Sequence, residues 1–252
     1  MRWGRAGRAD GRPHPGGRPA PANGASSFHL WWRLPPTDAV VEVAATVTVL
    51  RPPAVSALYF WALQVGFADR GRAVGAAHTG LQWNPAARAG AVNWGGYGPD
   101  GEELPGGGSQ LAMVDSVNTR AWPWDPGTPY RLRVWSPAPG AWRSTVTDLV
   151  DGRSATIRDL TVAATELVDP VVWAEIFARC DDPPTEVRWS DLAVTDRAGV
   201  TAAPIAVVTS YQLPAEGGCA NTESVVEAGA VHQRSGLAGR RRGAPGDVLA
   251  LA

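Results

Sequence analysis

The stretch VVEVAATVTV at residues 40–49 decides the fold class. Its odd positions are all apolar, whereas Glu42, Thr46 and Thr48 occupy even positions. An apolar residue at every second position is the signature of a strand with one buried face. Pro52 and Pro53 follow, and proline interrupts a β-ladder because it has no N–H group to donate. We therefore predict a half-buried strand that ends before residue 52.

The next apolar run predicts a central strand. Residues 58–67 read LYFWALQVGF, with large apolar side chains on both alternating faces, and such a strand is buried on both sides. Asp151-Gly152 lies between two further runs and is a typical sequence of a tight hairpin turn. The other predicted strands follow at short spacing: 77–83, 91–94, 109–114, 130–136, 142–149, 155–160, 171–178, 186–194 and 205–213.

These runs predict an all-β protein, an antiparallel β-sandwich of the jelly-roll type without a long amphipathic helix. We assign the sandwich to residues 28–213. Residues 1–27 form an arm rich in Arg, Gly and Pro, with five Arg and one acidic residue, which we expect to be disordered. For residues 214–252 we expect a tail, either wholly disordered or with one final strand before the disordered end.

Composition excludes several classes of function. All 23 basic residues are Arg, so P-loop phosphate binding through Lys and Schiff-base chemistry are excluded. Residues 28–213 hold 14 Arg against 19 acidic residues, which argues against a nucleic-acid partner. No apolar run approaches the roughly 18 residues of a transmembrane helix, so we expect no membrane span.

Cys180 and Cys219 are too few for a structural zinc site. They form a disulfide if the protein is exported, and are otherwise inert core residues. Residues 1–27 lack the apolar segment of a signal peptide, which predicts a cytoplasmic protein unless the start site is misassigned. We expect no cofactor and no metal; Asp181 and Asp182 are the candidates for Ca²⁺ should one bind. The oligomeric state stays open.

The order of short motifs resembles a bacterial family of unknown function, DUF3472. The motifs are Tyr59-Phe60-Trp61, His78-Thr79-Gly80-Leu81-Gln82, Val92-Asn93-Trp94-Gly95, Tyr130-Arg131-Leu132-Arg133-Val134-Trp135, Trp142 with Val146-Thr147-Asp148, and Trp189-Ser190-Asp191. The resemblance covers about residues 28–213. It implies a concanavalin A-like lectin or glucanase sandwich that is secreted and associated with carbohydrate, without an assigned reaction.

The sequence contains no motif that predicts a particular reaction. Residues 96–101 match GxGxxG, but Pro99 makes the helix that a dinucleotide needs implausible. Retaining glucanases place alternating carboxylates on one strand. The pairs found here, Glu102-Glu103 and Asp181-Asp182 among them, lie in turn-like sequence and are expected to be solvated. We interpret His78 as a structural or rim residue rather than as a catalytic base.

Twelve Trp residues are the remaining signal. Indole rings stack on sugars, and the N–H group adds a donor. Trp61, Trp135, Trp142, Trp173 and Trp189 lie on predicted strands and are expected in the core. Trp122 and Trp124 flank Pro123 in a loop, where we expect them to be partly exposed. Our candidate carbohydrate-binding residues are His78, Gln82, Trp83, Asn93, Trp94, Trp122 and Trp124.

The leading hypothesis is a non-catalytic module that binds a polysaccharide or other glycan. A glycan-active hydrolase or lyase without a recognisable motif is the first alternative, and a structural or adhesive domain is the second. Two facing carboxylates in a cleft would favour the enzyme. Exposed aromatic rings without such a pair would favour binding.

Overall fold

The computed structural model describes residues 17–19, 21, 24–87, 90–237 and 243–251. It is nearly all β and every strand pair is antiparallel, as the sequence predicts. The predicted arm at 1–27 lies mostly outside the described residues. Within the part of the chain that the structure describes, no helix has the length and apolar character to cross a membrane.

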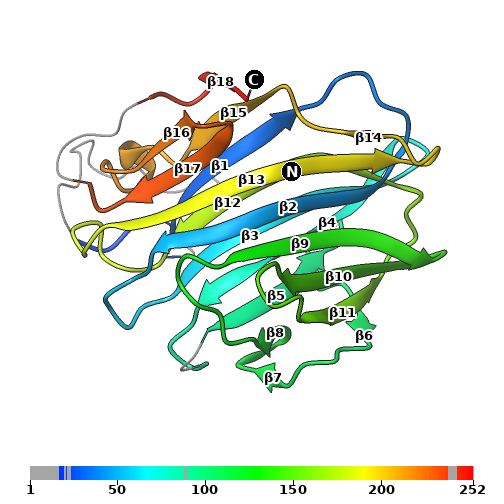
Figure 1. Ribbon diagram of the computed structural model, residues 1–252, viewed down its shortest axis with the longest axis horizontal. Coiled ribbons are helices and arrows are strands. Elements are labelled where there is room, and N and C mark those ends of the chain that lie inside the picture. Colours follow the sequence, from blue (N-terminus) through cyan, green and yellow to red (C-terminus); the bar gives the residue numbers. More distant parts are fainter. Residues whose placement is uncertain (1–16, 20, 22–23, 88–89, 238–242, 252) are drawn as a thin grey trace.

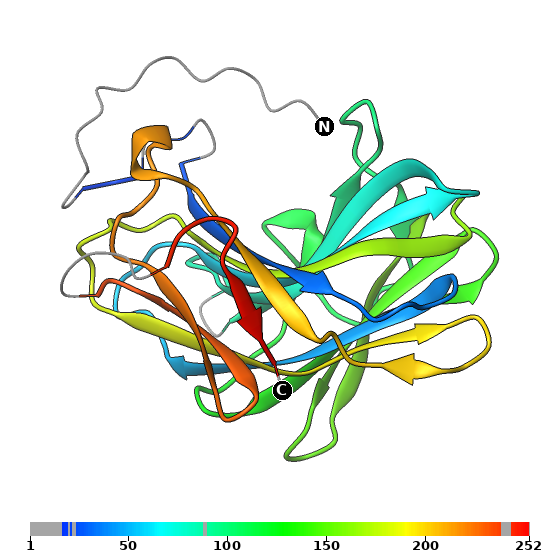
Figure 2. The same cartoon turned by 90° about the horizontal axis from the view of Figure 1, so that it is seen from above.

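The strands form two layers of one curled sheet (Figures 1 and 2). The layers join where Leu167 of β12 pairs with Val40 of β2. The first layer runs, in order of pairing, through β8 (Ser116–Ala121), β5 (Ala91–Tyr97), β4 (Arg72–Trp83), β3 (Tyr59–Asp69), β12 (Glu166–Ile176), β1 (Ser26–Arg33), β15 (Ala206–Tyr211) and β18 (Val248–Ala250).

The second layer covers one face of the first. It runs through β6 (Gly106–Gly107), β11 (Ser154–Thr161), β10 (Ala141–Asp148), β9 (Pro129–Ala138), β2 (Val40–Arg51), β13 (Thr185–Asp196), β17 (Ala230–Ser235) and β16 (Glu223–Glu227). The short β7 (Met113–Val114) and β14 (Thr201–Ala202) pair with β8 and β13, and η1 (Pro214–Glu216) is a single 3₁₀ turn.

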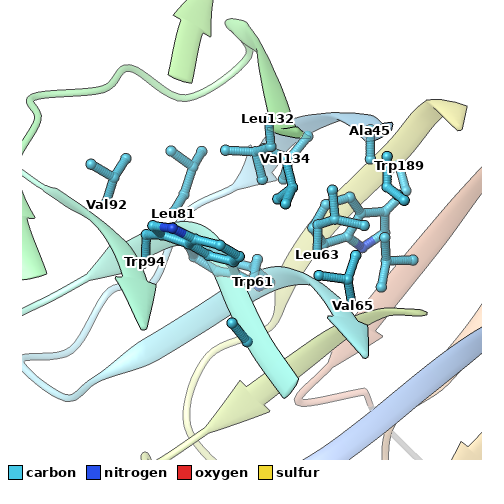
Figure 3. Packing of buried hydrophobic residues seen from close by; sticks show 14 of the residues in the cluster. Ala45, Trp61, Leu63, Val65, Leu81, Val92, Trp94, Leu132, Val134 and Trp189 are labelled. Atoms are coloured by element: carbon cyan, nitrogen blue, oxygen red, sulfur yellow. The ribbon is translucent and has the colours of Figure 1, made fainter. Parts of the chain in front are cut away.

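The core lies between the layers and is built by strand alternation (Figure 3). On β3, alternate side chains from Tyr59 to Phe67 point into it, and Trp61 is only 1% exposed. Trp94, Trp142 and Trp189 are equally inaccessible. The other face of β3 is also covered, because Phe60 and Ala62 belong to a second buried cluster. The prediction of a central strand over 58–67 is confirmed.

The predicted set of strands needs correction. Of the run 109–114, only Met113 and Val114 pair as a strand, whereas β1 and β8 were not predicted. The predicted tail at 214–252 contains β16 and β17, which pair with each other and with β13. Their apolar runs are short and interrupted by charged residues. The turn between them is set by Ala228 and Gly229, both at positive φ, which suits a tight hairpin.

Cys180 and Cys219 form a disulfide. It ties the segment after β12 to the segment before β16. Nearby hydrogen bonds fix the same region: Asn221 donates to the Cys180 carbonyl at 2.7 Å, which joins the same two segments, and the Cys219 N–H donates to Ser26 Oγ of β1 at 2.9 Å. Of the two alternatives for these cysteines, the structure therefore has the disulfide.

Candidate ligand-binding site

The outer face of the first layer carries an open hollow of about 330 Å³. It lies over β3, β4, β5 and β8, on the face that the second layer does not cover. On β4, Ala77, Thr79 and Leu81 point into the core, so His78 and Gln82 point outward. The alternation that builds the core thus also selects the residues of the hollow.

A missing side chain at Gly95 makes room for Asn118 in the hollow. Gly95 on β5 lies beside His78 on β4, and the amide of Asn118 lies over Gly95. A Cβ atom at this position would collide with the Asn118 side chain. Gly95 therefore allows Asn118, which comes from β8, to lie across the neighbouring strand.

Amide side chains form the floor. Asn84 Nδ2 donates to Gln82 Oε1 at 3.2 Å, and Asn93 Nδ2 donates to Thr119 Oγ1 at 3.3 Å. Gln82, Asn84 and Asn93 are at most 9% exposed. The Asn93 Oδ1 atom is buried and has no hydrogen-bond partner among the residues that the structure describes. An orphaned acceptor of this kind costs stability, because buried polar atoms are ordinarily paired.

A second amide is fixed at the rim. Asn118 Nδ2 donates to Glu103 Oε1 at 2.5 Å, and Arg158 Nη1 donates to Asn118 Oδ1. Arg158 also donates to the Val117 carbonyl at 3.0 Å and is only 4% exposed. Asn118 is thus held from both ends. Glu103, which we expected to be a solvated turn acid, is exposed but orients this amide.

An aromatic cluster adjoins the hollow. The ring centroids of Phe60 and Trp173 are 4.9 Å apart, and those of His78 and Trp173 are 5.5 Å apart. His29 lies on the opposite side of Trp173 at 5.8 Å. Burial lowers the pKa of His78 to about 4, and burial also lowers the pKa of His29 to about 4 against an opposing hydrogen bond with the Ser210 backbone. Both imidazoles are therefore neutral at pH 7.

The structure separates the predicted site residues into two groups. His78, Gln82 and Asn93 line the hollow together. Trp83 and Trp94 neighbour them in sequence but point to the opposite face. Trp94 is fully buried and donates to the Trp142 carbonyl at 3.2 Å, while the half-buried Trp83 donates to the Val55 carbonyl at 3.0 Å.

The expectation that Trp122 and Trp124 are partly exposed is wrong, because they are 2% and 6% exposed. Arg153 lies over the Trp122 ring, with its guanidinium carbon 4.2 Å from the ring centroid. Trp124 meets the edge of Trp61 at 5.9 Å and donates to the Gln82 carbonyl at 3.0 Å. This loop closes one end of the core. Its prolines indicate a loop but do not indicate whether the loop's side chains are buried.

The Ca²⁺ candidates already have other partners. Arg179 pairs with both carboxylate oxygens of Asp181, at 3.0 and 3.1 Å, and its N–H group donates to Asp182 at 2.8 Å. The Arg179 contact also holds the pKa of Asp181 below its usual range. Among the described residues, no group of three or more His, Cys, Asp or Glu side chains is arranged to hold a metal ion.

Several residues of the hollow were not among our candidates. Tyr97, Glu103, Asp115, Asn118 and Thr119 all line it. Tyr97 is 49% exposed and lies within the GxGxxG match, where the chain leaves β5 and turns rather than entering a helix. Thr119 could be identified as a site residue only because it pairs with Asn93 on the neighbouring strand. That pairing requires β8, which was not predicted.

The chain matches no protein-family model, and no curated protein matches it. Among solved structures it is similar to Scytalido-glutamic peptidase with a peptide-based transition-state analogue, at 13% identity and a TM-score of 0.44, over 82% of this chain and 97% of that one. SCP-B, a member of the Eqolisin family of peptidases in a complex with the tripeptide Ala-Ile-His, gives the same values. Peanut lectin with a 9mer peptide is similar at 11% identity and a TM-score of 0.29, over 87% and 76% of the two chains. Similarities this distant assign no function to this chain.

Proposed function

We propose that this protein is a glycan-binding module whose site is the hollow on the first layer. The observation that carries the proposal is the lining, which combines a floor of buried amides with the exposed side chain of Tyr97. Sugars offer hydroxyl groups that both donate and accept, and apolar C–H faces that stack on aromatic rings. The resemblance to DUF3472 is a proposal of the same kind, based on the quoted motifs.

The chemistry of the lining favours a glycan over other ligands. His78 is the one residue of the lining with a basic side chain, and burial keeps it neutral. A phosphate-bearing ligand would meet the carboxylates of Glu103 and Asp115 without a compensating arginine in the lining.

The proposal is tested by affinity electrophoresis of the purified protein through gels that contain different polysaccharides. We expect retention on at least one gel, and about fivefold weaker retention for Tyr97→Ala, which removes about 1 kcal/mol of ring contact. Trp31→Ala is the matched control, because Trp31 is an exposed ring on β1 outside the hollow. Equal loss in both variants, or no retention of the parent on any gel, would contradict the proposal.

The hydrolase alternative is decided with the same panel. Glu103 and Asp115 both line the hollow, and glycosidases work with a pair of carboxyl groups. The same polysaccharides are incubated with the parent protein and assayed for newly formed reducing ends. Their release would replace binding by hydrolysis as the function, and Glu103→Gln would then identify the acid or the nucleophile.

We further infer that the protein resides in an oxidising compartment. The inference is based on the Cys180–Cys219 disulfide, since such bonds persist mainly in exported proteins. Protein from its native source, denatured without reductant, should show no free thiol in mass-spectrometric labelling. Two labelled thiols in that material would contradict the inference.

A further inference from the structure

We propose that the floor of the hollow selects an uncharged sugar by holding one of its hydroxyl groups between Gln82 and Asn93. The proposal deepens the glycan-binding function and rests on it. It assigns the chemical class of the ligand and the two residues that determine it.

The first step concerns Gln82. Its Oε1 atom is occupied by the Asn84 donor. Its Nε2 group has no hydrogen-bond partner among the described residues, although Gln82 is only 5% exposed and lines the hollow. An amide nitrogen offers two N–H donors and no acceptor. The floor therefore presents an unused donor at this position.

The second step concerns Asn93. Its Nδ2 group is used by Thr119, whose hydroxyl also lies 3.1 Å from Ser116 Oγ. Among the described residues its Oδ1 atom has no partner, and Asn93 is 6% exposed. The floor therefore also holds an unused acceptor, which is covered in the free protein and must turn toward the hollow to meet a ligand.

The third step is the spacing of the two groups. Gly80, two positions before Gln82 on β4, is the cross-strand partner of Asn93 on β5. Gln82 and Asn93 are thus diagonal neighbours on one face, at roughly 7–8 Å, a distance that long side chains bridge. Gly80 itself projects no side chain between them. A single hydroxyl placed there accepts from Gln82 Nε2 and donates to Asn93 Oδ1.

The fourth step is the charge of the surroundings. Glu103 and Asp115 line the rim, and both bear carboxylates. Arg120 of β8 and Arg158 of β11 do not line the hollow. They are 8% and 4% exposed and donate to the Thr119 and Val117 carbonyls. The uronic acid of an acidic polysaccharide would meet negative charge without an accessible cation. An uncharged sugar meets no such penalty.

The test uses Gln82→Glu, which keeps the shape and the acceptor for Asn84 but replaces the free donor by an oxygen. Gln64→Glu is the matched control. Gln64 lies on β3 on the same face, outside the hollow, and its Oε1 accepts from Trp173 Nε1 at 3.2 Å, so a carboxylate preserves that bond. Both variants add one negative charge to the same face. Thermal melting of each variant shows that it is folded, and Gln82→Met repeats the loss of the donor without a charge.

We expect the parent to be retained by neutral polysaccharides, such as cellulose derivatives, xylan or mannan, and not by polygalacturonate. Gln82→Glu and Gln82→Met should bind at least tenfold more weakly, while Gln64→Glu binds like the parent. Stronger retention of the parent by polygalacturonate, unchanged binding of Gln82→Met, or equal losses in Gln82→Glu and Gln64→Glu would each overturn the assignment of the floor and leave glycan binding intact. Failure of the parent to bind any gel would instead refute the proposed function itself.

Discussion

Removal of the disulfide gives the most quantitative prediction for this fold. The bond joins Cys180 and Cys219, which are 39 residues apart in sequence. Opening a loop of this length raises the entropy of the unfolded chain by about 13 cal/mol/K, which corresponds to about 4 kcal/mol at 25 °C. The folded state loses little, because the hydrogen bonds of Asn221 to the Cys180 carbonyl and of the Cys219 N–H to Ser26 do not need the sulfur atoms.

The variant is Cys180→Ala/Cys219→Ala, and the measurement is urea unfolding followed by tryptophan fluorescence. The free energy of unfolding should fall by about 4 kcal/mol, and the slope of the transition should rise because the unfolded chain exposes more surface. Dithiothreitol is the control: it should destabilise the parent by a similar amount and leave the variant unchanged. A fall below about 1 kcal/mol with an unchanged slope would refute the loop-entropy reasoning.

Three further predictions concern stability. Trp61→Ala should cost about 3–5 kcal/mol in urea unfolding, since it empties the centre of the core; a parent-like midpoint would contradict this. His29 and His78 have pKa values near 4, below the unfolded value of 6.5, so stability should be complete above pH 6.5 and fall as the pH drops to 4, by up to about 3 kcal/mol each; a flat pH profile would refute it. Asp159→Asn should cost less than about 1 kcal/mol, because the Arg143–Asp159 pair is partly solvent-exposed; a larger loss would indicate a network.

The fold class could be predicted because alternation is a local property. The runs at 40–49 and 58–67 record which residues face the core, and β2 and β3 follow them. The hairpin of β10 and β11 follows from Asp151-Gly152 in the same way. β1 was missed although Phe28, Leu30 and Trp32 alternate along it, because the run is short and Trp31 makes its outer face partly apolar as well. The burial pattern of β8 does not alternate, so its sequence carries no such signal. β8 pairs with β5 through only three residue pairs.

The composition does not predict which tryptophans are buried and which lie on the surface. An indole is suited both to a core and to a sugar, so its number predicts neither role. Trp124 was expected on the surface because prolines surround it, yet it contacts Trp61 and Trp83 and donates to the Gln82 carbonyl. Its exposure is decided by whether the end of the sandwich is open, and only the three-dimensional arrangement contains that information.

The alternation of side chains along a strand explains why two of the four candidates on β4 and β5 that are adjacent in sequence line the hollow and two do not. Gln82 and Trp83 are adjacent in sequence, as are Asn93 and Trp94, and in each pair one member faces the hollow and the other faces the core. The two members of each pair are neighbours in the sequence, so both were chosen as candidates. Successive side chains of a strand point to opposite faces, however, so only one member of each pair faces the hollow. The outward members are also the polar ones, which is why a purely aromatic search would have chosen the buried half. If a carbohydrate binds in this region, its polar contacts come from the amides and its exposed aromatic contact from Tyr97, whose position among glycines gave no signal of its own.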